Sequence, residues 1–190
     1  GLCAMDDMRC LPGQGLDMSG RQKDDWYPTP EIATRRLLDV EMFDEQIWEP
    51  AAGDGAIAKV LKTACYDVIS SDLNDYGYCE SGIDFLLEQK RAADHLVSNP
   101  PYKLAEEFIR HAIDLGVDKH AWLLRLSFLE GQKRYQRLFQ DSPPIRVHVF
   151  SQRLTMWRGD EEARNVGGTT AYAWFVWRAT YTGSPQLGWL

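Results

Sequence analysis

The sequence predicts one α/β domain, in which a mostly parallel sheet carries helices on both faces. Strand-like and helix-like segments alternate between residues 31 and 139, and the connections between them are short. Two more strand-like segments follow, separated by a long polar stretch without a helix-like pattern, which predicts an antiparallel pair at one edge of the sheet. The length of 190 residues suits a single domain with one sizeable core.

The individual elements follow from hydrophobic periodicity and from turn residues. A first helix is expected over 31–40, after a rigid turn, with Thr29 as its N-cap and Pro30 at its first position. The residues of this helix expected to point partly inward are Ile32, Leu37 and Leu38. The other expected helices are 56–63, 104–115 and 130–139. The expected strands are 46–49, 66–70, 95–98, 121–126, 145–150 and 171–177, with a short extended piece at 84–86. The aromatic residues of the last strand, expected to be buried on both faces, are Trp174, Phe175 and Trp177.

The domain organisation is read from composition. Residues 1–24 show no periodicity and are expected to form a flexible N-terminal arm, followed by one domain over 25–190. The polar stretch 151–170 ends in two glycines and is expected to be a mobile loop on the target side. No apolar run approaches the roughly 20 residues of a membrane span, and no secretory signal pattern starts the chain, so we expect a cytoplasmic protein. No cysteine has a metal-ligand spacing with histidine, so no metal is expected.

The charge is unevenly distributed along the chain. The net charge of −7 argues against a generic nucleic-acid binder. Residues 1–102 carry 9 Lys/Arg against 19 Asp/Glu, a net −10, whereas residues 103–190 carry 12 against 9, a net +3. One stretch concentrates the basic residues Arg125, Lys133, Arg134, Arg137, Arg146, Arg153, Arg158 and Arg164. These residues form either a solvated surface or a phosphate-facing side of an acidic protein.

A glycine loop follows the strand 46–49 and opens the next helix. Gly53 and Gly55 let the backbone approach a ligand, and with Ala58 they fit the spacing of a dinucleotide fingerprint. Asp72 lies 19 residues after Gly53, at the end of the next strand, where its carboxylate can accept the two hydroxyls of a ribose. An adenosine-containing cofactor is therefore expected, with Ala51 and Leu73 in the same site.

The glycine loop alone does not distinguish NAD from S-adenosylmethionine. Glu49 stands at the very end of its strand, where a carboxylate would repel a pyrophosphate but suits the positive amino group of a methionine moiety. Asp84 and Phe85 follow Asp72 and can bond an adenine amino group and pack on its ring. Both observations favour S-adenosylmethionine.

The loop that decides the chemistry is Asn99-Pro100-Pro101-Tyr102. It follows a buried strand, where open α/β sheets bind their ligands. The lone pair of an adenine amino nitrogen is conjugated into the ring, so this nitrogen is a poor nucleophile. Two acceptors aimed at its N–H bonds, the Asn99 side-chain oxygen and the Pro100 carbonyl, would free the lone pair, and Tyr102 offers a face for the base. Positioning and electrostatics then carry most of the barrier.

Taken together, these motifs resemble the adenine-N6 DNA methyltransferases, in particular the small ones of phages and prophages. The resemblance covers residues 26–177, and the closing strand with its preceding Gly167-Gly168 belongs to it. It implies an S-adenosylmethionine-dependent, Rossmann-like class I fold with a seven-stranded sheet, and a flipped-out target adenine. The cofactor residues that it implies are Tyr27, Thr29, Pro30, Glu49, Ala51, Gly53, Gly55, Asp72, Leu73, Asp84, Phe85 and Asn99. The catalytic residues that it implies are Asn99, Pro100, Pro101 and Tyr102.

The chain departs from that family in size, because sequence-reading members usually carry a separate target-recognition domain. In this chain only residues 125–170 can serve for target recognition. The substrate-binding candidates are Tyr102, Arg153, Trp157, Arg158 and Arg164. A partner protein for target recognition is therefore one expectation. The alternatives are an RNA adenine methyltransferase, a protein glutamine methyltransferase, a non-catalytic nucleotide-binding or partner-binding module, and a dehydrogenase.

Overall fold

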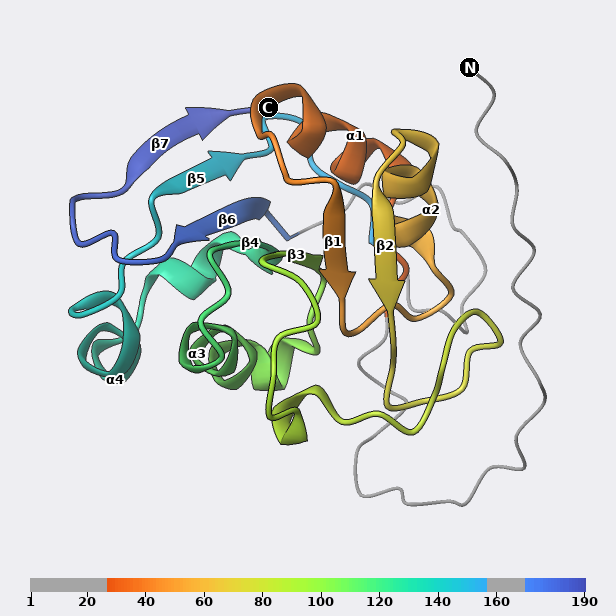
Figure 1. Ribbon diagram of the computed structural model, residues 1–190. Coiled ribbons are helices and arrows are strands. Elements are labelled where there is room, and N and C mark those ends of the chain that lie inside the picture. The colour runs from red at the N-terminus through yellow and green to blue at the C-terminus, as the bar shows by residue number, and fades with distance from the viewer. Residues whose placement is uncertain (1–26, 157–169) are drawn as a thin grey trace.

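A seven-stranded sheet forms the centre of the protein in a computed structural model that describes residues 27–156 and 170–190 (Figure 1). The strands are β1 (Gln46–Glu49), β2 (Asp67–Ser70), β3 (His95–Ser98), β4 (Lys119–Arg125), β5 (Arg146–Val149), β6 (Tyr172–Arg178) and β7 (Gln186–Trp189). They lie in the order β2-β1-β3-β4-β6-β5-β7. All neighbouring strands are parallel except that β6 runs antiparallel to β4 and to β5. The predicted mostly parallel α/β sheet is confirmed.

The helices cover both faces of this sheet, as expected. The helices α1 (Glu31–Val40) and α2 (Ala56–Thr63) pack on one face, and α3 (Ala105–Asp114) packs on the other together with α4 (Gln132–Arg134) (Figure 1). The π-helix η5 (Tyr135–Phe139) continues α4, so the helix predicted over 130–139 is only partly α-helical. The short 3-10 helices are η2 (Phe85–Leu87), η3 (Tyr102–Leu104) and η4 (Leu126–Leu129).

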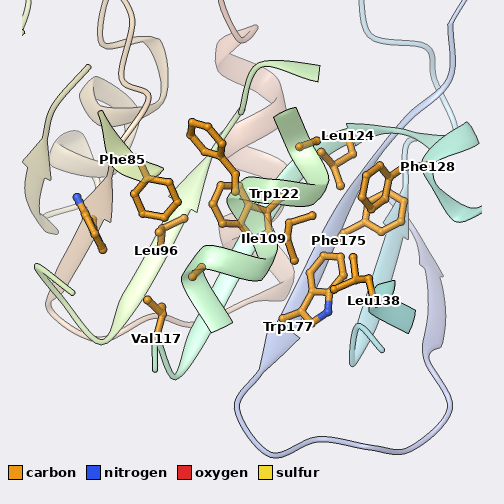
Figure 2. Packing of buried hydrophobic residues seen from close by; sticks show 14 of the residues in the cluster. Phe85, Leu96, Ile109, Val117, Trp122, Leu124, Phe128, Leu138, Phe175 and Trp177 are labelled. Atoms are coloured by element: carbon orange, nitrogen blue, oxygen red, sulfur yellow. The ribbon is translucent and has the colours of Figure 1, made fainter. Parts of the chain in front are cut away.

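Strand β6 shows how the sheet divides the core. Trp174 faces α1 and donates its indole N–H to the Ala33 carbonyl at 2.8 Å. Phe175 and Trp177 face the other side, where they join the cluster around Trp122 and α3 (Figure 2). Since successive side chains of a strand alternate between faces, one aromatic strand supplies both halves of the core. The expected two-sided burial of these aromatics is confirmed.

Three details of the elements differ from the expectations. The implied seven-stranded sheet with an antiparallel β5–β6 pair is confirmed, but no residue range was expected for the seventh strand, β7, which pairs in parallel with β5 at the edge of the sheet. The piece 84–86 is not extended, because the Asp84 carboxylate accepts the Leu86 N–H at 3.1 Å and starts the 3-10 helix η2. On α1 the buried residues are Ala33, Thr34 and Leu37, whereas Ile32 is half exposed.

Two of the domain predictions lie largely outside the described residues. These are the N-terminal arm over 1–24 and most of the loop over 151–170. Within residues 27–156 and 170–190, no helix has the length and hydropathy that a membrane crossing requires.

Candidate active site

The site lies where the parallel strands end. Glu49 is the last residue of β1, Asp72 follows the end of β2 by two residues, and Asn99 comes directly after β3. Because these three strands are adjacent and parallel, their carboxyl ends meet at one edge of the sheet, the usual ligand position in open α/β folds. A pocket of about 920 Å³, open mouth included, occupies this edge. The predicted residues that line it are Tyr27, Thr29, Glu49, Ala51, Asp72, Leu73, Asp84, Phe85, Asn99, Pro100, Pro101 and Tyr102.

The glycines shape the loop instead of lining the pocket. Neither Gly53 nor Gly55 is among the lining residues, nor is Pro30. Gly53 has φ 55° and donates its N–H to the Asp72 carboxylate at 2.9 Å. Gly55, with φ 83°, precedes α2, and a Cβ there would come within 2.5 Å of the Tyr78 ring. Positive φ and this close approach explain both glycines without a ligand contact.

The Asp72 carboxylate is buried and held by the backbone. One oxygen accepts the Gly53 N–H at 2.9 Å, and the other accepts the Asn74 N–H at 2.8 Å. Burial raises the pKa of this group, against the lowering effect of these hydrogen bonds. Each carboxylate oxygen keeps a second lone pair, so the group can also accept hydrogen bonds from ligand hydroxyls.

The Glu49 side chain is an acid inside the pocket wall. It is 1% exposed, and one oxygen accepts the Ser98 hydroxyl at 2.5 Å and the Ala51 N–H at 3.1 Å. Burial raises its pKa to about 8, the neighbouring charge of Asp72 raises it too, and the two hydrogen bonds act in the opposite direction. A carboxyl with this pKa is largely protonated at neutral pH and ionises readily when a cation comes beside it.

The Asn99 amide has a fixed orientation. Its nitrogen donates to the Tyr27 carbonyl and to the Thr29 hydroxyl oxygen, each at 3.1 Å. A carbonyl can only accept, so the amide arm next to Tyr27 must be the NH₂ group. This leaves the Asn99 side-chain oxygen, which no described residue uses as an acceptor, on a residue that lines the pocket.

The role expected of Thr29 as a helix cap is wrong. The residue before α1 is Pro30, and no side chain caps the helix N-terminus. Thr29 is buried, and its hydroxyl oxygen accepts from Asn99 instead. The physical reason is competition for one acceptor: a side chain directed at Asn99 is not available to the first N–H groups of α1.

Tyr102 has aromatic and cationic neighbours on several sides. Its ring centroid lies 5.6 Å from that of Tyr27 and 6.1 Å from that of Tyr172, both tilted. The guanidinium carbon of Arg125 lies 4.7 Å from the Tyr102 centroid. The Tyr102 ring therefore lines the pocket and also contacts Arg125, the last residue of β4.

Asp84 and Phe85, at the start of η2, also line the pocket. Besides lining it, Asp84 caps η2 through the Leu86 N–H. The Phe85 ring is 2% exposed and packs edge-on against Trp48 at 5.1 Å and tilted against Phe108 at 4.9 Å. Phe85 thus serves the core and borders the pocket at once.

The pocket is acidic. In addition to the three acids already described, Asp54 lines it and accepts the Ala56 N–H at 3.1 Å. A helix N-terminus normally attracts anions, but at the N-terminus of α2 the Asp54 carboxylate already accepts a backbone N–H. This arrangement disfavours a pyrophosphate and suits a ligand with a cationic group and hydroxyls.

The described residues of the predicted basic stretch differ in whether they have acidic partners. Arg146 pairs with the buried Glu41, and Arg137 forms two hydrogen bonds to Glu106, at 2.8 and 3.1 Å. Ion pairing within the protein thus neutralises part of the stretch. Arg153 is exposed and does not line the pocket. The other predicted substrate-binding residues of this stretch, Trp157, Arg158 and Arg164, lie outside the described residues.

Sequence reasoning missed several residues of the site. The most informative is Ser98, which does not line the pocket but is fully buried and donates to the pocket residue Glu49. A signal for it was present, because Ser98 is the polar residue that ends a buried strand directly before Asn99. The pocket-lining residues that were missed include Ile57, Asn74, Tyr76, Leu104 and Phe108.

Comparison with known proteins identifies the fold. No protein-family model matches the sequence, and no curated protein matches it either. A Pyrococcus horikoshii protein described as an RNA methyltransferase superposes with a TM-score of 0.63 at 13% identity, over 86% of this chain and 91% of that one. A protein of Agrobacterium tumefaciens described as an O-methyltransferase gives 0.55 at 14% identity, over 84% of each chain.

A third similar structure is a modification subunit of a type I restriction enzyme from Vibrio vulnificus. Its TM-score is 0.53 at 12% identity, over 85% of this chain, and the chain spans 45% of that subunit. These similarities show that the protein has the class I S-adenosylmethionine-dependent methyltransferase fold, as the sequence motifs implied.

Proposed function

We propose that the protein transfers a methyl group from S-adenosylmethionine to the N6 amino group of adenine in DNA. The observation that carries this proposal is the fixed Asn99 amide, whose nitrogen is held by Tyr27 and Thr29 and whose oxygen remains available beside an acidic pocket. Because Asn99 follows β3 and lines the pocket, its oxygen would accept a hydrogen bond from a planar amine bound there.

The acidic pocket fits the proposed cofactor. Glu49 would hold the amino group of the methionine moiety, Asp72 the ribose hydroxyls, and Asp84 with Phe85 the adenine amino group and ring. Tyr27, Ala51 and Leu73 would line the same site, beside the loop that Gly53 and Gly55 shape. Bound S-adenosylmethionine supplies a methyl group on a sulfonium, which is already a strong electrophile.

The chain's own contribution to the reaction is to orient the target nitrogen. Neither the Asn99 side-chain oxygen nor the Pro100 carbonyl accepts a hydrogen bond from a described residue. These two oxygens would accept hydrogen bonds from the two N–H groups of the amine. Two acceptors draw the nitrogen toward tetrahedral geometry and free its lone pair, while Tyr102 supports the flipped-out base. The nitrogen would then bond to the methyl carbon as the carbon–sulfur bond breaks, S-adenosylhomocysteine would leave, and the methylated nitrogen would lose one proton to solvent. Pro101 helps to fix the backbone of this loop.

DNA as the target rests on the motif resemblance to the adenine-N6 enzymes. The same loop suits the carboxamide of a protein glutamine or an adenine in RNA equally well, so the target has to be tested directly. Labelled methyl transfer from S-adenosylmethionine to DNA, RNA and a protein mixture, side by side, is the decisive experiment. We expect label in DNA, recovered as N6-methyladenine and absent with the Asn99→Ala variant. Label confined to RNA or to protein would refute the DNA assignment.

The pKa of Glu49 predicts a pH dependence of cofactor binding. A raised carboxyl pKa means that the empty pocket holds a proton below about pH 8, and this proton must leave when a cationic amino group binds. We therefore expect the affinity for S-adenosylhomocysteine, which carries the same amino group, to rise between pH 6 and pH 8, by up to about tenfold per pH unit.

The matched variant for this prediction is Glu49→Gln. It keeps an oxygen that can accept from Ser98 and Ala51 but has no proton to release. We expect it to bind S-adenosylhomocysteine more weakly than the wild type at pH 8 and with little pH dependence, as isothermal titration calorimetry can measure. An equally steep pH dependence in the variant would assign the titration to another group.

A further inference from the structure

Arg125 lies beside the pocket, in contact with the lining residue Tyr102. It is the last residue of β4, its side chain is exposed, and its guanidinium lies over the Tyr102 ring at 4.7 Å. Its cross-strand partner is Tyr172, whose ring also neighbours Tyr102. Tyr102 lines the pocket and Arg125 does not, so the guanidinium lies just outside the pocket wall.

The charge of Arg125 is not neutralised by the described part of the chain. Most other described arginines pair with carboxylates, namely Arg35, Arg36, Arg91, Arg134, Arg137, Arg146 and Arg178. Within residues 27–156 and 170–190, no Asp or Glu forms an ion pair with Arg125, and its described contact is the face of an aromatic ring. A cation–π contact at an exposed site is weak, so a phosphate can compete for the guanidinium.

We infer that Arg125 binds a backbone phosphate of the nucleic-acid strand that carries the target base. The inference rests on the proposed function and extends it to a residue for which no role was predicted individually. A base supported by Tyr102 lies inside the pocket, so its sugar and phosphate must lie at the mouth. The planar guanidinium can stack on an aromatic ring and also form paired hydrogen bonds to a phosphate. A protein glutamine substrate would bring no such anion.

The salt dependence of DNA binding tests this inference without requiring catalysis. Fluorescence anisotropy of a labelled 20-base-pair duplex of mixed sequence, at several salt concentrations, gives the slope of log K against log salt. Each phosphate contact contributes about 0.9 to the size of that slope. We expect Arg125→Met, which can still cover the Tyr102 ring, to bind more weakly and to reduce the slope by about 0.9. Arg125→Lys, which keeps the charge, should retain the slope.

Arg178→Met is the matched control because it removes the same charge from the opposite end of the sheet. Arg178 pairs in register with Lys119, at the start of β4, whereas Arg125 ends that strand. We expect this variant to keep the wild-type slope. An unchanged slope in Arg125→Met, with intact folding by circular dichroism, would overturn the inference. If wild-type protein transfers no methyl group to any nucleic acid, the proposed function fails instead, whatever the binding data show.

Discussion

Replacing Asn99 with alanine is expected to reduce the rate of methyl transfer by a factor on the order of 10²–10³. The variant loses the side-chain acceptor that we assign to the target amine, and the amine lone pair then stays conjugated in the ring. Binding of S-adenosylmethionine should change little, because the acids assigned to it are on other segments. Single-turnover kinetics give the rate, and calorimetry gives the cofactor affinity. Unchanged turnover would refute the role of Asn99.

Thr29 provides a second test of the same geometry. Thr29→Val keeps the shape of the side chain but removes the hydroxyl that accepts from the Asn99 amide at 3.1 Å. We expect the kcat to fall by up to about tenfold, the size of one net hydrogen bond, with the KM for cofactor nearly unchanged. Thr29→Ser, which restores the hydroxyl, should recover the rate. Equal rates in the valine and serine variants would show that Thr29 serves only the packing of this segment.

Local motifs made much of this site predictable. Asn99 and Asp72 each follow a strand that the sequence marks clearly, and parallel strands must bring these positions to one edge. The contact between Asn99 and Thr29 spans 70 residues, and no local pattern records it. A threonine before a helix is normally a cap, so its tertiary role overrides its local preference.

The limits of the sequence are also visible in the glycines and in the last strand. Gly53 and Gly55 were correctly placed in a loop, but their spacing cannot tell whether a ligand, a positive φ or, at Gly55, the Tyr78 ring excludes a side chain. Strand β7 was not predicted from the sequence because Gln186–Trp189 is short, largely exposed and without a buried periodicity. Pairing with β5 defines it as a strand, and pairing is a long-range property.

The residue with the largest expected effect on stability is Glu41, far from the chemistry. Its carboxylate is buried and accepts from Lys119 at 2.7 Å, from two nitrogens of Arg146 and from His148 at 2.9 Å. These partners belong to β4 and β5, whereas Glu41 follows α1. The cluster therefore connects the segment after α1 to two strands of the sheet, β4 in its middle and β5 beside the edge strand β7.

Replacing Glu41 with glutamine is expected to reduce the free energy of unfolding by about 3–5 kcal/mol at pH 7. The change leaves the charges of Lys119 and Arg146 without their counter-charge, and Lys119 is almost fully buried. Urea denaturation of the full chain measures this loss. The control is Glu31→Gln, which removes an exposed ion pair with Arg35 and should cost less than about 1 kcal/mol. Similar losses in both variants would contradict the assignment.

The cluster around Glu41 also predicts how the free energy of unfolding depends on pH. Burial alone would raise the pKa of Glu41, but hydrogen bonds from His148, Arg146 and Lys119 outweigh burial and hold this pKa well below its ordinary value. A group with a lowered folded-state pKa stabilises the protein above its unfolded pKa of about 4.5, and this stability is lost as the pH falls further. Urea midpoints measured from pH 6 to pH 3 should therefore converge for wild type and Glu41→Gln. A constant difference between the two across that range would contradict the lowered pKa of Glu41 as the source of the pH dependence.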